Sequence, residues 1–151
     1  MKMIIQRILA ISAVIVLSLV LNYATTQDII SVEAGQIGFQ VLLIIYLIQL
    51  VVFLVSFILK TEHYYDLTGG ITYITVIVFT LYQKQLLGTL DFRSILLGIL
   101  ILVWAMRLSS FLFLRIKKAG KDRRFDKIKT NFTRFMLAWA LQGFWVFMCT
   151  L

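Results

Sequence analysis

Long runs of uncharged residues constrain the fold of this chain more than any other feature. In the clearest run, Ile37 to Leu59, 23 residues pass without a charge. As an α-helix this run extends about 35 Å, enough to cross the roughly 30 Å hydrocarbon core of a bilayer with some tilt. Hydrophobic residues make up 61% of the 151 residues, against roughly half in soluble domains. The sequence therefore predicts an integral membrane protein.

Four further apolar runs have the length of a membrane-spanning helix, so the sequence predicts an all-α, polytopic transmembrane helix bundle with about five spans. They cover residues 8–24, 71–87, 94–114 and 135–151, and the last reaches the roughly 17-residue minimum for a span only at Leu151. No repeat or linker divides the chain, so we expect a single transmembrane domain over residues 1–151.

The first run has a second interpretation, because Lys2 and Arg7 precede it as the basic residues of a signal peptide would. Against cleavage, the run is long for a signal peptide, and Asn22 stands where a small residue is expected before a cut after Ala24. We expect this run to be retained as the first span.

The distribution of Lys and Arg predicts the orientation, because short positively charged loops stay in the cytoplasm. With five spans, the N-terminus and the loops at residues 60–69 and 115–134 share one side of the membrane, which then holds twelve of the 15 basic residues. We therefore expect the N-terminus and loop 115–134 to be cytoplasmic. The membrane itself is either a bacterial plasma membrane or the endoplasmic reticulum.

The basic loop at residues 115–134 has three interpretations. Its positive charge serves as a topology signal or attracts anionic membrane lipid. Its stretch GKDRRFD, residues 120–126, also combines a glycine, two carboxylates and two guanidiniums, a mixture suited to gripping a phosphate-bearing ligand. Nucleic acid is not expected as a partner, because the stretch is short, tethered at the membrane and interrupted by Asp122 and Asp126.

Polar residues within spans are the other source of information, because each is costly in hydrocarbon. Arg107 lies about 10 Å from the cytoplasmic end of the fourth span. An ion pair with Asp66 is one hypothesis for it, and bonding to backbone carbonyls or lipid head groups is the other. One face of the second span carries Tyr46, Gln49, Phe53 and Ser56. We expect this face to contact another helix, with Gln49 forming a hydrogen bond to it.

The residue types that several kinds of site require are missing. His63 is the only histidine and Cys149 the only cysteine, so neither a metal site nor an internal disulfide is predicted. No glycine-rich phosphate loop of dinucleotide or P-loop spacing occurs. A cofactor fold of the soluble type is therefore excluded.

Four short motifs give the chain a family resemblance. They are Tyr-Asp-Leu-Thr-Gly, within KTEHYYDLTGGITYITV at residues 60–76, and Trp-x-x-Arg-Leu, Gly-Lys-Asp-x-Arg-Phe and Leu-Gln-Gly-x-Trp, within residues 96–147. With these motifs, residues 40–151 resemble an uncharacterised membrane family related to steroid 5-alpha-reductases. The first span is similar only as a generic hydrophobic segment.

The resemblance implies an all-helical fold in which NADPH enters from the cytosol and reduces a conjugated double bond of a lipid such as a steroid. The chain would then belong to an oxidoreductase acting on a CH–CH group of a hydrophobic lipid substrate. The implied catalytic candidates are Tyr65 and Asp66, with Tyr64 and Tyr73 as further candidates for a substrate-polarising tyrosine. The implied cofactor-binding candidates are Arg107, Arg115, Asp122 and Arg124.

The resemblance also implies a longer protein. Members of that family continue through further spans to an Arg-His-Pro-Asn-Tyr type motif that holds much of the nucleotide, and this sequence has no such motif. We therefore expect the N-terminal part of a reductase-like fold, inactive alone and completed by a C-terminal half in cis or in trans. The alternative is a non-catalytic membrane scaffold whose basic cytoplasmic loop binds anionic lipid.

Overall fold

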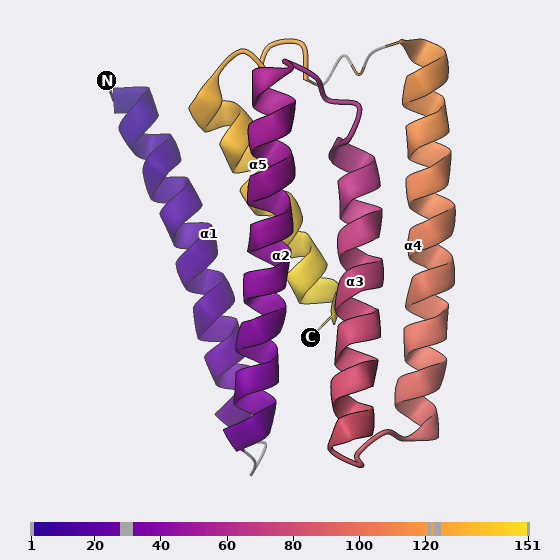
Figure 1. The fold of residues 1–151 in the computed structure, drawn as a ribbon. Coiled ribbons are helices and arrows are strands. Elements are labelled where there is room, and N and C mark those ends of the chain that lie inside the picture. Colours follow the sequence, from indigo (N-terminus) through magenta and orange to yellow (C-terminus); the bar gives the residue numbers. More distant parts are fainter. Residues whose placement is uncertain (1, 28–31, 121, 123–124, 151) are drawn as a thin grey trace.

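The computed structural model describes residues 2–27, 32–120, 122 and 125–150, which form an all-α bundle (Figure 1). Its helices are α1 (Lys2–Gln27), α2 (Val32–Ile58), α3 (Tyr65–Leu86), α4 (Phe92–Ala119) and α5 (Phe132–Thr150). No strand occurs within the described ranges. The fold class predicted from the apolar runs is confirmed.

Helix α5 holds the bundle together. It packs against α1, α2 and α3, and in Figure 1 it crosses behind α2 at an incline. Helix α4 lies at one edge of the bundle, where it packs on α3 alone among the described helices. The outer side of α4 is therefore left to the surroundings of the bundle.

Four of the helices are long and apolar enough to cross a membrane, over Lys2–Thr25, Gln36–Ile58, Phe92–Ala119 and Phe132–Thr150. Large apolar side chains such as Leu47, Leu54 and Leu100 are exposed on their outer faces, as lipid-facing helices require. The chain is thus a multi-pass integral membrane protein. Helix α3 has 22 residues but is not among the four, because polar residues interrupt its apolar stretch; it nevertheless runs alongside α2 and α4 (Figure 1).

The start of α1, the α2–α3 connection and the α4–α5 connection all lie at one end of the bundle (Figure 1). The α3–α4 connection lies at the opposite end. This grouping is the one that the basic residues predicted. That this end faces the cytoplasm stays a prediction.

The predicted ends of two loops are wrong. Residues 65–69 form the first turn of α3 and not part of a loop, and α4 continues to Ala119, past the apolar run that ended at residue 114. The helix stops where Gly120 adopts a left-handed conformation with φ of 76° and donates its N–H to the carbonyl of Ile116. Glycine takes this conformation without the steric cost of a Cβ, so it ends the helix.

The core lies where α5 meets α2 and α3, and it has two clusters. The central one contains Val41, Leu42, Ile45, Tyr73, Val76, Ala105, Val146 and Phe147. The second, near the basic loop, contains the aromatic residues Phe53, Phe125, Phe135 and Trp139. The helix contact predicted for α2 is confirmed, because Gln49 Nε2 donates to Thr72 Oγ1 of α3 at 3.4 Å.

Candidate functional site

A pocket of about 150 Å³ lies between α3, α4 and α5, and three of the four sequence motifs meet there. Each motif belongs to a different helix, so only the folded bundle brings them together. The motif residues that line the pocket are Asp66 and Gly69 of α3, Trp104 and Leu108 of α4, and Gln142 and Trp145 of α5. We call this space the motif pocket.

Two glycines allow the three helices to approach closely at the motif pocket. A Cβ on Gly70 would lie 2.3 Å from Cβ of Ser109 on α4, and a Cβ on Gly69 would lie 2.7 Å from Nε2 of Gln142 on α5. Real Cβ atoms do not approach so closely, because the van der Waals repulsion is too large. The glycine pair therefore sets the spacing of α3 against its two neighbours.

Gln142 joins α5 to the first turn of α3 and carries an unsatisfied oxygen. Its Nε2 donates to the carbonyl oxygen of Tyr65 at 2.9 Å, whereas its Oε1 is buried without a hydrogen-bond partner among the described residues. The hydroxyl of Tyr73, which lines the same pocket, is also buried without a hydrogen-bond partner among the described residues. Such groups are the ones that a ligand or an ordered water satisfies.

The sequence had given Gln142 and Ser109 no role. Both are uncharged polar residues inside apolar runs, and Gln142 belongs to the Leu-Gln-Gly-x-Trp motif. Intramembrane polar residues of this kind usually face the bundle interior. That signal was present, but the sequence did not show which helices Gln142 and Ser109 would face.

Above the motif pocket, Glu62 fastens the α2–α3 connection to the α4–α5 connection. Its side chain is 1% exposed. Oε2 accepts from Nζ of Lys129 at 2.7 Å, and Oε1 accepts from the backbone N–H of Asp122 at 3.0 Å. A buried carboxylate is stable only when its charge is compensated in this way.

The pKa of Glu62 reflects two opposing influences. Burial, the largest, raises the pKa of the carboxyl, and the hydrogen bonds from Lys129 and from the Asp122 amide lower it. The balance holds the pKa below its usual range. Glu62 is therefore ionised at neutral pH and acts as an anchor, not as a proton donor.

His63 adds a second connection between the same two segments. Its Nε2 donates to the carbonyl oxygen of Gly120 at 3.1 Å, and its Nδ1 lies 2.6 Å from Oγ1 of Thr61. The contact joins residues 57 positions apart in the sequence.

The two catalytic candidates differ in their placement. Asp66 is half-buried and lines the motif pocket. Tyr65 instead donates its hydroxyl to the carbonyl oxygen of Ala138 at 2.9 Å, and its ring packs against Phe125 and Trp139 with centroid distances of 4.8 and 5.2 Å. Tyr65 thus positions α5, and Tyr73 is the candidate tyrosine that faces the pocket.

The cofactor-binding candidates do not gather at one point. Arg107 and Arg115 are exposed on α4, and neither lines the motif pocket. Asp122 is buried beside Glu62. Arg124 lies outside the described residues.

The Asp66–Arg107 ion pair is not found between these two described side chains. Arg107 lies on the outer face of α4 together with Phe111, which is 63% exposed. Because α4 packs on α3 alone, this face points away from the bundle. Of the two hypotheses for Arg107, the ion pair with Asp66 is therefore not supported by the described side chains, and bonding to backbone carbonyls or lipid head groups stays a prediction.

Comparison with known proteins places the chain in a family. No curated protein and no solved structure matches it. A family model described as a protein of unknown function, DUF1295, matches residues 52–151, a segment that contains all four motifs and every residue of the motif pocket. That family is one of steroid 5-alpha-reductase-like proteins. This multi-pass membrane protein belongs to the DUF1295 family.

Proposed function

We propose that the chain forms part of an NADPH-dependent membrane reductase that acts on a conjugated CH–CH double bond of a steroid or similar lipid. One observation carries the proposal, namely that motifs from α3, α4 and α5 converge on a single pocket. The family resemblance supports the class of reaction. The apolar surroundings of the pocket suit a substrate that arrives from the bilayer.

The motif pocket fits one part of the cofactor. Its 150 Å³ is below the roughly 300–1,000 Å³ of pockets that enclose a whole small molecule, so the full dinucleotide does not fit inside. A carboxamide-bearing ring suits the acceptors at Asp66 and Gln142 Oε1. NADPH supplies a hydride when bound, and these residues orient the ring that carries it.

The phosphates of the cofactor remain outside the motif pocket on this proposal. The candidate groups for binding phosphate are Arg107 and Arg115 on α4 and Arg124 in the basic loop. A guanidinium suits this role because it donates two parallel hydrogen bonds to the oxygens of one phosphate. The remaining contacts come from a further segment in cis or in trans. The pair of loops fastened by Glu62 gives that segment a fixed surface on which to dock.

The proposal is tested on the native protein from its source membrane, whose intact mass also reveals any further segment. NADPH binding is measured by calorimetry in bilayer nanodiscs. Arg124→Ala is expected to weaken binding by about 1–3 kcal/mol, the scale of a charged hydrogen bond. Lys127→Ala, an exposed cation of the same loop, is the matched control and should leave the affinity nearly unchanged.

Two results would contradict the proposal. Without saturable NADPH binding, or with binding that other polyphosphates displace equally well, the chain is a membrane scaffold whose basic loop attracts anions. Equal losses for Arg124→Ala and Lys127→Ala would remove the specific role of Arg124. A selective, salt-resistant NADPH complex that reduces an enone lipid would support it.

A further inference from the structure

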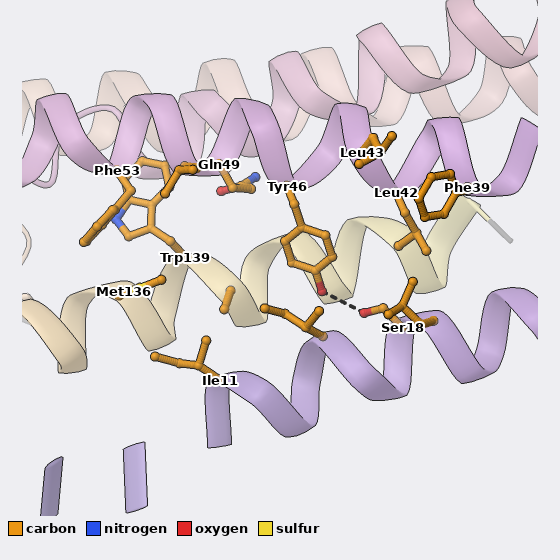
Figure 2. Close-up of a pocket in the computed structure, with 14 residues that line it drawn as sticks. Ile11, Ser18, Phe39, Leu42, Leu43, Tyr46, Gln49, Phe53, Met136 and Trp139 are labelled. Carbon is orange, nitrogen blue, oxygen red and sulfur yellow. Dashed lines mark hydrogen bonds between the residues drawn. The ribbon is translucent and has the colours of Figure 1, made fainter. Parts of the chain in front are cut away.

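A second cavity, of about 310 Å³, lies between α1, α2 and α5 (Figure 2). On α2 it follows one face from Phe39 through Tyr46 to Phe53, which corresponds to about 21 Å along the helix axis. Ile11 and Leu19 of α1 border it along its length. The cavity is therefore long and narrow and runs parallel to the helices; we call it the slot.

The walls of the slot suit a hydrocarbon chain. The polar side chains that border it bond within the protein: the Tyr46 hydroxyl lies 2.7 Å from Oγ of Ser18 (Figure 2), and Nε2 of Gln49 donates to Thr72 on α3. Two buried polar atoms of the lining, Oε1 of Gln49 and Nε1 of Trp139, have no hydrogen-bond partner among the described residues. The other lining residues are apolar or aromatic, with Trp139 of α5 among them. Elsewhere the wall offers no hydrogen bonds, so a polar ligand would lose its hydration there and recover hydrogen bonds at these two atoms alone.

Arg7 stands at one end of the slot. It lies one turn before Ile11 on the same face of α1. Its Nη1 donates to Oδ1 of Asn131 at 3.0 Å and to Oγ1 of Thr133 at 3.3 Å, at the start of α5. Neither Nε nor Nη2 of Arg7 has a hydrogen bond to a described residue, so part of the guanidinium is available to an anion.

We propose that Arg7 and the slot form a binding site for an anionic membrane lipid. The carboxylate or phosphate of the lipid binds the guanidinium of Arg7, and one hydrocarbon chain lies in the slot between α1, α2 and α5. The distance from Arg7 to Ile11 is about 6 Å along α1, so head group and chain are reached by one molecule. This site is separate from the motif pocket and does not depend on the proposed reductase activity.

Trp139 provides a local probe of the slot. It is 2% exposed and lines the slot, whereas Trp104 and Trp145, the other two of the three tryptophans, line the motif pocket. The double variant Trp104→Phe, Trp145→Phe therefore leaves fluorescence from Trp139 alone. Brominated lipid chains quench tryptophan only on contact, so quenching of this variant reports a chain in the slot.

The experiment uses the full chain in phosphatidylcholine nanodiscs. Lipids with brominated chains are added as phosphatidylglycerol, as a free fatty acid or as phosphatidylcholine. We expect one or both anionic lipids to quench Trp139 at mole fractions about tenfold lower than phosphatidylcholine, the effect of one charge-assisted hydrogen bond. The anionic lipid that quenches Trp139 at the lower mole fraction shows whether the site prefers a phosphate or a carboxylate head group.

Matched variants separate the head-group site from the slot. Arg7→Gln should abolish the preference for anionic lipid, and Arg93→Gln, an exposed arginine of α4, should preserve it. Leu19→Phe narrows the slot without adding a fluorescent tryptophan, and it should weaken the quenching of Trp139 by every lipid. Leu17→Phe, on an exposed position of α1 that does not line the slot, should not.

Three outcomes would overturn the proposal. Equal quenching by phosphatidylglycerol, fatty acid and phosphatidylcholine would show that the slot has no head-group preference. Equal effects of Arg7→Gln and Arg93→Gln would show that the preference comes from overall charge. No quenching of Trp139 by any lipid, with folded protein confirmed by circular dichroism, would show that no chain enters the slot.

Discussion

At the scale of single residues, Glu62 has the most consequential environment in the chain. Its carboxylate accepts hydrogen bonds from the Lys129 ammonium and from the Asp122 backbone amide, and Asp122 lies 60 positions later in the sequence. The side chain of Lys129 is 22% exposed and that of Glu62 only 1%. Removing the Glu62 carboxylate therefore leaves a lysine that can reach water, whereas removing the Lys129 ammonium leaves a buried, uncompensated carboxylate. We therefore expect Lys129→Met to be the more costly of the two substitutions.

Glu62→Gln is expected to lower the free energy of unfolding by about 1–3 kcal/mol, because a charge-assisted pair is replaced by weaker hydrogen bonds. The pKa of Glu62 is lowered in the folded protein, so its contribution is present above the pKa of the unfolded carboxyl, about 4.3, and is lost as pH falls through the folded pKa. Thermal unfolding in micelles between neutral and acidic pH measures both effects.

The double variant Glu62→Gln, Lys129→Met provides the control for this prediction. If the two residues act as a pair, the double variant loses less stability than the sum of the single variants. In the variants that lack the Glu62 carboxyl, the free energy of unfolding should also fall less steeply between neutral and acidic pH. Additive losses, or an acid transition unchanged in Glu62→Gln, would contradict the role assigned to the pair.

At the scale of helices, the contact between α3 and α4 depends on Gly70. The missing Cβ leaves room for Ser109, which donates to the carbonyl of Ala105 at 2.7 Å and so stays on its own helix. We expect Gly70→Ala to destabilise the protein by about 1–3 kcal/mol, the usual cost of overpacking. Ser109→Gly should partly restore stability in the double variant, because it removes the colliding Cβ.

Gly69→Ala is the matched control for Gly70→Ala. The nearest atom to its added Cβ is the end of the Gln142 side chain, which rotates away more easily than a Cβ moves. We therefore expect Gly69→Ala to be milder in denaturant unfolding. A Gly70→Ala protein as stable as the wild type, or one that Ser109→Gly further destabilises without any rescue, would contradict the packing role.

The same glycines show where sequence reasoning stopped. The apolar runs predicted the helices, because length and hydrophobicity suffice to identify a span. The loop was expected to end at Gly69 and the third span to begin after Gly70, because a glycine pair is a turn signal when its neighbours are unknown. Two hypotheses were left open for Arg107 for a similar reason, since its surroundings depend on α4 lying at the edge of the bundle.

For the whole molecule, the two ends of the bundle give a test of topology across α4. Thr130 in the α4–α5 connection and Thr89 in the α3–α4 connection are both exposed. In a Cys149→Ser background, Thr130→Cys and Thr89→Cys should react with a membrane-impermeant maleimide from opposite sides of sealed vesicles. Labelling from the cytoplasmic side is expected for Thr130→Cys, as the positive charge of its loop predicts.

The measurement tests the crossing of α4, because α4 is the helix that lies between residues 89 and 130. Labelling of both cysteines from the same side would show that α4 does not cross the membrane as the bundle requires. Thr130→Cys accessible only from outside would reverse the orientation without changing the fold. Opposite labelling with Thr130→Cys on the inside would support both the crossing of α4 and the predicted orientation.

The packing of α1 on α5 has a consequence for biosynthesis. A chain enters the membrane from its N-terminus, yet Arg7 binds Asn131 and Thr133, 124 and 126 positions later. Until α5 emerges from the ribosome, α1 has only α2 as a neighbour in the described bundle, and lipid occupies the place of α5. The slot between these three helices therefore forms only after α5 has been inserted, and it closes around whatever lipid is already there.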